Sequence, residues 1–118
     1  MGATKREARE SDFFVELPGV GVFRYGRRTY GDQLRIRAEQ LKLAREVGDD
    51  DPDLALYAGT IAVHRVLCVE APDGWEDLAD VDLTAVGVER VFDLIALLRE
   101  KEDSFRASAE PKGKAARS

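Results

Sequence analysis

Residues 52 to 69 read PDLALYAGTIAVHRVLCV, the longest stretch of the chain with only scattered polar residues. At a helical repeat of about 3.6 residues, its apolar side chains cover nearly the whole circumference and leave a narrow polar stripe. A helix that is apolar nearly all round must be surrounded by other elements or lie in a membrane. Spanning a bilayer takes about 20 apolar residues, and this stretch carries His64 and Arg65. The sequence therefore predicts the buried central helix of a small domain.

Two residues mark the start of this helix. Asp51 fits the N-cap position, and Pro52 fits the first helical position, where a backbone N–H group is not needed. The second half leaves a strand open as an alternative, because β-branched residues are frequent in strands. The β-branched residues of that half are Ile61, Val63, Val66 and Val69. The length of the stretch favours a helix.

The length of 118 residues predicts one domain with a core that needs no covalent or metal crosslink. The single cysteine, Cys68, excludes an internal disulfide and indicates a reducing compartment. Residues 1–11 are rich in charge and lack the apolar run of a signal peptide, so we expect them to be disordered. Residues 12–106 are expected to form the folded domain, and residues 107–118 a flexible basic tail.

A β-hairpin is predicted at the start of the folded part. Residues 13–17 read FFVEL and residues 20–25 read VGVFRY, which suits two short strands. Pro18 and Gly19 between them are typical of a tight turn, because proline presets φ and glycine accepts a positive φ. Two strands alone are marginally stable in water, so the hairpin is expected to pack on helices or on a partner.

A helix is predicted from about Tyr30 or Asp32 to Val47. Thr29 and Asp32 resemble a capping box at its start, and Gly48 fits a C-terminal cap. This helix carries two apolar stripes on nearly opposite sides. The first consists of Leu34, Ala38 and Leu41, and the second of Ile36, Leu43 and Val47. One stripe is needed for the core, and the other is either core as well or a contact face for another protein.

The last helix is predicted from about Leu83 to Phe105, with Asp82 as its cap. One side of it is apolar and is expected to face the core. That side consists of Val88, Val91, Phe92, Ile95 and Leu98. Leu94, Leu97 and Phe105 lie at or beyond one margin of this side, and we expect them to be exposed apolar residues.

Residues 71–75 read APDGW and predict a turn between the central and last helices. Trp75 and Leu78 after it are expected to fold back on the helices. Together these elements predict a mainly α fold of the α+β class. It is a three-helix domain with a central buried helix and an N-terminal β-hairpin.

Charge is unevenly distributed along the chain, whose formal net charge is −5. Residues 24–37 are basic, whereas residues 46–53 and 70–82 are acidic. Poles of opposite sign can steer a partner protein. The basic cluster, interleaved with aromatic residues, is also the one feature shared with nucleic-acid-binding proteins. The net negative charge favours the alternative, in which its arginines pair with acidic residues on a solvated surface.

Side chains for catalysis or metal binding are not found together in a known pattern. His64 and Cys68 lie four residues apart on one side of the predicted helix, as a Cys–His nucleophile pair could require, but a buried thiol beside a histidine at the edge of the core is the favoured interpretation. Zinc needs three or four ligands. The acidic residues 49–53 lack the spacing and the glycine of an EF-hand loop. No phosphate-binding glycine motif is present. We therefore expect no enzymatic activity, no metal and no cofactor.

Three segments of the chain resemble a known family. They read FFVELPGVGVFRYGRRTYGDQ from residue 13, CVEAPDGWEDLADVDL from residue 68, and LREKEDSFR from residue 98. The most specific pieces are LPGVGVFRYGRRT at residues 17–29 and APDGW at residues 71–75. In these segments the chain resembles the tail assembly chaperones of long-tailed phages, over roughly residues 13–106.

The resemblance implies a non-enzymatic assembly factor in the host cytoplasm. Members of the family bind the long helical tape measure protein, keep it soluble and help to recruit tail tube subunits. The implied partners are therefore the tape measure protein and the tail tube protein, with a homo-oligomer as a further alternative. Neither a membrane nor a nucleic acid is an implied partner.

Surfaces for a helical client are sought among the basic cluster, the second stripe of the first long helix and the margin of the last one. The candidate partner-binding residues are Arg27, Arg28, Ile36, Leu43, Val47, Leu94, Leu97 and Phe105. Two other functions stay open. One is a structural head–tail connector or minor tail protein retained in the virion, and the other is a small nucleic-acid-binding regulator that uses the cluster from Arg24 to Arg37.

Overall fold

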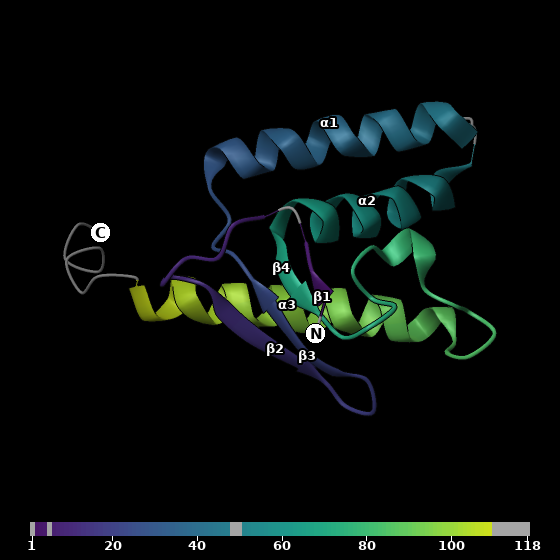
Figure 1. Ribbon diagram of the computed structural model, residues 1–118. Coiled ribbons are helices and arrows are strands. Elements are labelled where there is room, and N and C mark those ends of the chain that lie inside the picture. Colours follow the sequence, from purple (N-terminus) through teal and green to yellow (C-terminus); the bar gives the residue numbers. More distant parts are fainter. Residues whose placement is uncertain (1, 5, 48–50, 110–118) are drawn as a thin grey trace.

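The structure is a computed structural model that describes residues 2–4, 6–47 and 51–109. Its described part is an α+β fold of helices on an antiparallel sheet (Figure 1), as the sequence predicts. The elements are β1 (Gly2–Ala3), β2 (Phe13–Leu17), β3 (Gly21–Tyr25), α1 (Tyr30–Val47), α2 (Pro52–Leu67), β4 (Cys68–Ala71), the 3₁₀ helix η1 (Leu78–Asp80) and α3 (Val88–Ala109).

The predicted hairpin is present as β2 and β3. The two strands pair antiparallel, with Phe13 opposite Tyr25 and Leu17 opposite Gly21. Gly19 in the turn has a φ of 83°, which a glycine adopts without strain. The alternating residues of β2 that point inward, with Phe13 at one end and Leu17 at the other, are buried in the core.

The sheet is larger than the predicted hairpin, and its strand order is β1-β4-β3-β2. Strand β4 follows α2 without a loop and pairs antiparallel with β3, with Tyr25 opposite Cys68 and Arg24 opposite Glu70. The predicted helix over residues 52–69 therefore ends two residues early, at Leu67. The β-branched residues near the end of this stretch leave a strand open for its second half, and a strand does form, but only from Cys68 onward.

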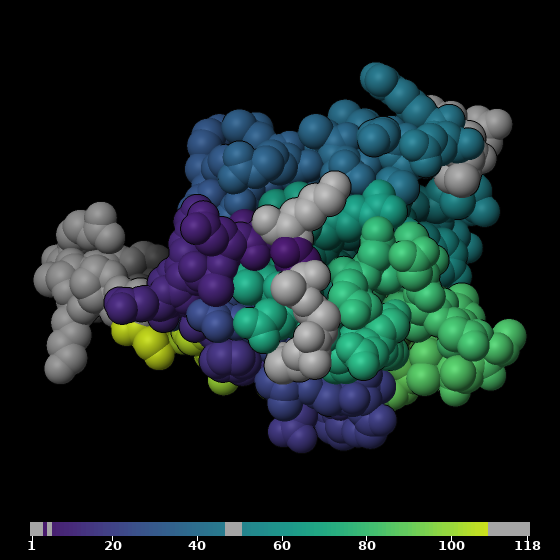
Figure 2. Space-filling model, in the orientation of Figure 1, coloured from purple at the N-terminus to yellow at the C-terminus, as the bar shows by residue number. Residues whose placement is uncertain are grey.

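The prediction of disorder over residues 1–11 is wrong for the described part of that segment. Gly2 and Ala3 pair with β4, and the Thr4 backbone N–H donates to the Val69 carbonyl at 3.0 Å. The Arg6 guanidinium reaches the carboxylate of Asp32 at 3.0 Å. In Figure 2 the N-terminal segment lies against the strands and the start of α1. Composition misses this anchoring because it is made by hydrogen bonds and one ion pair rather than by apolar side chains.

Helix α1 begins with the predicted capping box. The Thr29 N–H donates to the Asp32 carboxylate at 2.9 Å, and the Asp32 N–H donates to the Thr29 hydroxyl at 3.0 Å. Asp32 is 1% exposed and also accepts from Arg6 and Arg35. Burial would raise the pKa of Asp32, but the hydrogen bonds from Arg6, Thr29 and Arg35 hold it well below its usual range.

Helix α2 is central, with α1, β4, η1 and α3 around it. Asp51 caps it by accepting the Asp53 N–H at 2.9 Å, and Pro52 occupies its first turn, as predicted. Its second half is buried, but its first half exposes Leu56 and Tyr57 at 57% and 43%. The prediction of a helix surrounded on all sides therefore holds for the second half of α2 only.

Helix α3 runs along the sheet, and in the view of Figure 1 α2 and β4 lie between it and α1. It begins at Val88, five residues later than predicted, because the Asp82 carboxylate accepts the Thr84 N–H at 2.9 Å and forms a local turn. It continues to Ala109, past the predicted end at Phe105. Trp75 and Leu78 pack into the core as predicted.

Candidate partner-binding site

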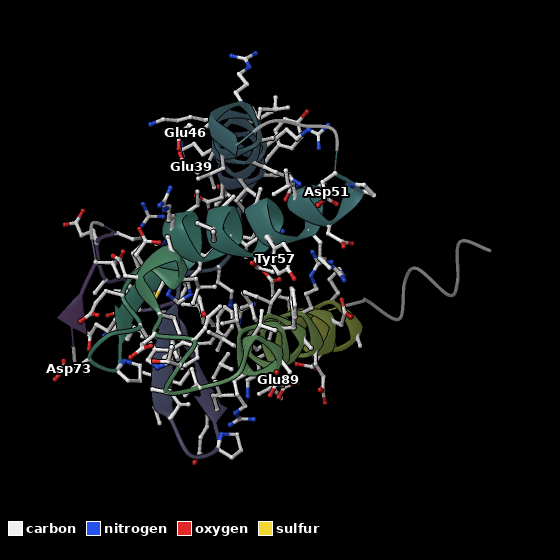
Figure 3. All side chains as sticks on the ribbon, turned by 90° about the vertical axis from the view of Figure 1, so that its right-hand side faces the viewer. Glu39, Glu46, Asp51, Tyr57, Asp73 and Glu89 are labelled. Atoms are coloured by element: carbon white, nitrogen blue, oxygen red, sulfur yellow. The ribbon has the colours of Figure 1, made fainter. Side chains whose placement is uncertain are left out.

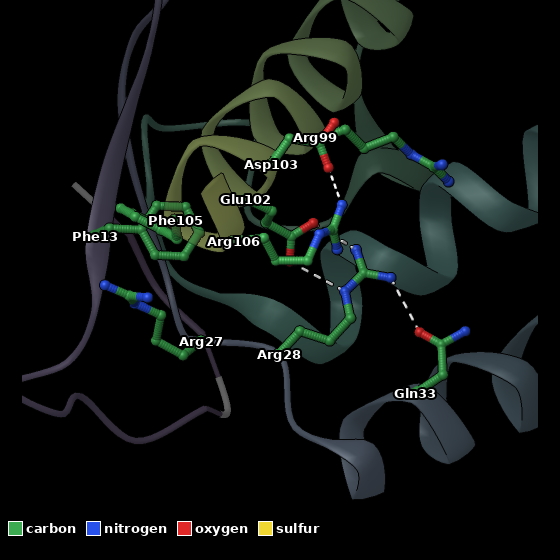
Figure 4. Close-up of a pocket in the computed structure, with 9 residues that line it drawn as sticks. All are labelled: Phe13, Arg27, Arg28, Gln33, Arg99, Glu102, Asp103, Phe105 and Arg106. Carbon is green, nitrogen blue, oxygen red and sulfur yellow. Dashed lines mark hydrogen bonds and ion pairs between the residues drawn. The ribbon is translucent and has the colours of Figure 1, made fainter. Parts of the chain in front are cut away.

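A groove opens where the last turns of α3 approach the start of α1 and strand β2. Its first part has a volume of about 590 Å³ and is called the basic end (Figure 4). The basic end is lined by Phe13, Arg27, Arg28, Gln33, Arg99, Glu102, Asp103, Phe105 and Arg106. A second hollow of about 470 Å³ lies between α1, α2 and α3 and is called the apolar end. Arg28, Gln33 and Arg99 line both, so the two hollows are neighbouring parts of one groove.

Arg28 forms the floor of the basic end. Its guanidinium donates to both oxygens of the Glu102 carboxylate, at 3.1 and 2.9 Å, and to the Gln33 side chain at 3.0 Å. Figure 4 shows these three side chains meeting between α3 and the start of α1. The side chains of Arg28 and Glu102 are 24% and 14% exposed. A bidentate pair of this kind fixes both side chains, so Arg28 positions α3 against α1 and keeps little free charge.

Arg27 and Phe105 form the wall next to β2. The Arg27 guanidinium lies 3.7 Å from the centre of the Phe105 ring, a cation–π contact. Phe105 in turn meets the Phe13 ring edge to face at 4.9 Å. Arg27 itself remains exposed. This wall therefore offers a positive charge over an aromatic base.

The apolar end lies between the first half of α2 and the middle of α3. Ile36, Val63 and Ile95 form its bottom, and Leu56 and Phe92 stand at its rim. The Tyr57 ring lies 5.5 Å from the Phe92 ring, centre to centre, and extends the rim. An exposed apolar surface in a hollow, next to charged residues, is typical of a site that buries another apolar chain.

Arg99 stands at the junction of the two ends of the groove. Its side chain is exposed, and it makes no ion pair with any residue that the structure describes. In Figure 4 it extends from α3 to the side away from Phe105. Arg99 is thus an available cation at the centre of the groove, which the sequence analysis missed. The sequence could have indicated its exposure, because Arg99 follows Leu98, which belongs to the predicted core-facing side of the helix.

Four of the eight predicted binding residues line this groove. Arg27, Arg28 and Phe105 line the basic end, and Ile36 lies at the bottom of the apolar end, where it is only 4% exposed. Leu94 does not belong to a surface: it is fully buried, because α3 turns Leu94 toward the sheet. The prediction for Leu94 is therefore wrong.

Leu97 and Phe105 are half-buried rather than exposed, and both pack against the core. The expected exposure of these two residues is therefore wrong in degree. Phe105 still lines the basic end, whereas Leu97 lines neither part of the groove.

The two stripes of α1 differ in exposure, and the second one, which the sequence left open as core or contact face, belongs to the core side. Ile36 is buried and Leu43 is half-buried, whereas Leu34 and Leu41 are 60% and 46% exposed. The buried capping residue Asp32 explains this orientation, because Ile36 follows it by one turn on the same side. Of the two alternatives for the second stripe, core is therefore the one that Ile36 and Leu43 follow, and their use as an exposed partner-binding stripe is not supported. The side chain of Val47, the third member of the second stripe, lies outside the described part of the structure. The predicted cap Gly48 lies outside the described residues as well.

The buried histidine joins three elements of the core. His64 is 0% exposed; its Nε2 lies 2.7 Å from the Trp75 carbonyl and its Nδ1 lies 2.8 Å from the Tyr25 hydroxyl. A carbonyl can only accept, so Nε2 carries the proton and Nδ1 accepts from Tyr25. Burial lowers the pKa of His64 to about 4, and it raises the pKa of Tyr25 well above its usual value. His64 is therefore a neutral structural residue.

Cys68 does not pair with His64. Its thiol donates to the Glu70 carbonyl at 3.4 Å, and burial raises the pKa of Cys68 to about 12. A thiol with so high a pKa is protonated at neutral pH and is a weak nucleophile. The predicted burial of the thiol is confirmed, whereas His64 lies inside the core rather than at its edge.

Within residues 2–4, 6–47 and 51–109, no three His, Cys, Asp or Glu side chains gather as a metal site. In the same described ranges, no helix has the length and apolar character that crossing a bilayer requires. Comparison of the chain with known protein families, with curated proteins and with solved structures finds no match.

Proposed function

We propose that this protein is a non-enzymatic tail assembly chaperone of a long-tailed phage and that it holds a helical segment of the tape measure protein in the groove. The single observation that carries this proposal is the groove between α1, α2 and α3, with its apolar and basic ends side by side. The resemblance of residues 17–29 and 71–75 to that family supports the same function.

The apolar end suits one side of an amphipathic helix. Such a helix binds by placing apolar side chains at spacings of three and four residues into a hydrophobic groove. Leu56 and Phe92 at the rim, with Ile95 below them, offer apolar contacts along the edges of α2 and α3. A long helical protein that has not yet assembled exposes apolar stripes, and covering them keeps it soluble.

The basic end gives the complex an orientation. Arg99 and Arg27 are exposed there, whereas Arg28 is engaged by Glu102. Opposite charges across an interface fix register and speed association more than they raise affinity. The preferred client segment therefore carries acidic residues next to its apolar stripe.

The two other functions fit less well. In the basic cluster, Arg24 pairs with Asp12 and Arg28 with Glu102, so the free positive charge is smaller than the sequence suggests. This weakens the proposal of a nucleic-acid-binding regulator. A connector or minor tail protein needs an extended contact surface within the particle. The exposed hollows favour a reversible client site, and finding the protein in purified virions would favour the structural role.

Co-expression with the tape measure protein of the same phage tests the proposal. We expect the tape measure protein to become soluble and to co-purify with this chain. The variant Leu56→Asp should lose the complex, because it places a carboxylate in the apolar end. Phe14→Asp is the matched control, since Phe14 is equally exposed, at 54%, and lies outside the groove. Equal solubility with Leu56→Asp and the unchanged protein would contradict the assignment to the groove.

A further inference from the structure

The outer side of α1 carries an apolar stripe that the fold leaves uncovered. Tyr30, Leu34 and Leu41 are 83%, 60% and 46% exposed, and Ala38 between them is exposed as well. Their spacings of four, four and three residues place all four on one side of a helix. A shallow hollow of about 430 Å³ runs beside Ala38 and Leu41. This exposed side of α1 lies opposite the side that borders the groove.

The charges around this stripe are mostly basic, although the exposed Glu46 also lines the hollow beside Leu41. On a helix with about 100° per residue, an arc of about 160° centred near Arg45 contains four charged residues, and each is basic. They are Arg35, Arg37, Lys42 and Arg45. We call this arc, with its apolar stripe, the outer face of α1. Such concentration is unusual in a chain whose net charge is −5.

The acidic residues of α1 lie on its other side. Asp32 is buried beneath Arg6 and Arg35, and Glu39 pairs with Arg65 of α2 at 2.7 Å. Figure 3, which looks along α1, shows Glu39 and Glu46 on one side of the helix. Asp32 and Glu39 thus serve the contact with the rest of the domain, whereas Glu46 is exposed at the edge of the outer face, which keeps an excess of positive charge.

The basic residues of the outer face contribute little to the fold. Arg35 forms an ion pair with Asp32, but Arg37, Lys42 and Arg45 form none with any described residue. Exposed, unpaired arginines around exposed leucines need a reason outside the folding of this domain. A partner with acidic residues on both sides of an apolar stripe supplies one.

We propose that the outer face of α1 docks an acidic amphipathic helix of a partner protein, at a site separate from the groove. The apolar stripe would pack against the partner's apolar stripe, and Arg37 and Arg45 would meet its carboxylates, as flanking charges do in paired helices. Two copies of this face would bring like charges together, which disfavours a symmetric dimer. Two leucines and a tyrosine are too small an apolar area for stable membrane binding.

The test uses the full chain and two synthetic helical peptides of about 21 residues. Both peptides have Leu at the a and d positions of each heptad; one has Glu at e and g, and the other has Lys there. Like charges at e and g keep each peptide from pairing with itself. Binding is followed by fluorescence anisotropy of a labelled peptide. We expect the Glu peptide to bind and the Lys peptide not to bind, with affinity falling when salt is raised to about 0.5 M.

Variants on the outer face make the test specific. Arg37→Glu combined with Arg45→Glu should weaken binding of the Glu peptide by about tenfold or more. Arg37→Lys with Arg45→Lys is the matched control and should retain binding, because the sign of the charge is kept. Leu34→Ala with Leu41→Ala should also weaken binding. Circular dichroism checks that each exposed substitution leaves the fold intact. The same measurements are made in the Leu56→Asp background, which closes the groove to an amphipathic helix; binding of the Glu peptide that remains there and is lost with Arg37→Glu and Arg45→Glu belongs to the outer face.

Several results would overturn the proposal. These are no binding of the Glu peptide up to about 1 mM, equal binding of both peptides, and unchanged affinity in the Arg37→Glu, Arg45→Glu protein. Stronger binding to vesicles rich in phosphatidylserine or to single-stranded RNA, lost in the same variant, would assign the face to a lipid surface or a nucleic acid instead. Self-association that the variant abolishes would assign it to a second copy of this chain.

Discussion

Lowering the pH from 7 to 5 is expected to destabilise this protein through one side chain, His64. It is the only histidine of the chain, it is fully buried, and burial lowers its pKa from 6.5 to about 4. The unfolded chain therefore binds a proton between about pH 6.5 and 4 that the folded protein does not bind. Unfolding is favoured as the pH falls through this range, so stability rises with pH.

The size of the effect follows from the two pKa values. Between pH 7 and 5, a group that titrates at 6.5 when unfolded and at about 4 when folded removes about 2 kcal/mol from the free energy of unfolding. Carboxyl groups contribute little above pH 5, because their usual pKa values lie near 4. The loss is a large fraction of a typical stability of roughly 5–15 kcal/mol.

Urea unfolding at a series of pH values measures this loss. The fluorescence of Trp75, the single tryptophan, is a suitable signal because its side chain is buried and its carbonyl accepts from His64. The control is His64→Gln, whose amide can donate to the Trp75 carbonyl and accept from Tyr25 but does not titrate. The variant should be less stable at pH 7 and nearly independent of pH from 7 to 5. A wild-type change below about 0.5 kcal/mol, or the same slope in both proteins, would refute the reasoning.

Three further predictions concern packing and the N-terminal anchor. Leu94→Ala should lower the free energy of unfolding by about 2–5 kcal/mol, and Leu97→Ala clearly less, because of the two only Leu94 is fully buried. A loss below about 1 kcal/mol for Leu94→Ala in urea titrations would contradict its position in the core. Asp32→Asn should cost about 1–3 kcal/mol at pH 7, because it weakens the cap and leaves Arg6 without a carboxylate. The pKa of Asp32 is held below 3.8, so the difference in unfolding free energy between Asp32→Asn and the wild type should shrink as the pH falls below that value. A difference in unfolding free energy that stays constant in acid would argue against the ion pair. Gly26→Ala should lower the melting temperature, because the new methyl group meets the Arg6 guanidinium. In an Arg6→Ala background the same substitution should lower the melting temperature less. Equal decreases in both backgrounds would show that Arg6 does not approach Gly26.

The order of the main elements could be predicted because each has a local signal. The turn at Pro18 and Gly19, the capping box of Thr29 and Asp32, and the cap at Asp51 are set by residues only a few positions apart. Such signals act through backbone φ angles and short-range hydrogen bonds, which can be predicted from the residue types at these positions.

The features that were missed depend on contacts between distant residues. Strand β1 exists because it pairs with β4, about 70 residues later, and Arg6 is held by Asp32 of α1. The orientation of α1 could have been inferred from Asp32, whose capping role and buried ion pairs place Ile36 on the inner side. The groove itself is formed by three helices that no local pattern brings together.

Site-specific photo-crosslinking tests the central claim most directly, namely that the groove between α1, α2 and α3 holds the client helix. A photoreactive phenylalanine analogue is placed at Leu56 at the rim of the apolar end, or at Phe14 on the outer side of the sheet, and the chain is co-expressed with the tape measure protein. Our account predicts a crosslink to the tape measure protein from position 56 and none from position 14. Crosslinks of equal yield from both positions, or from position 14 alone, would contradict it.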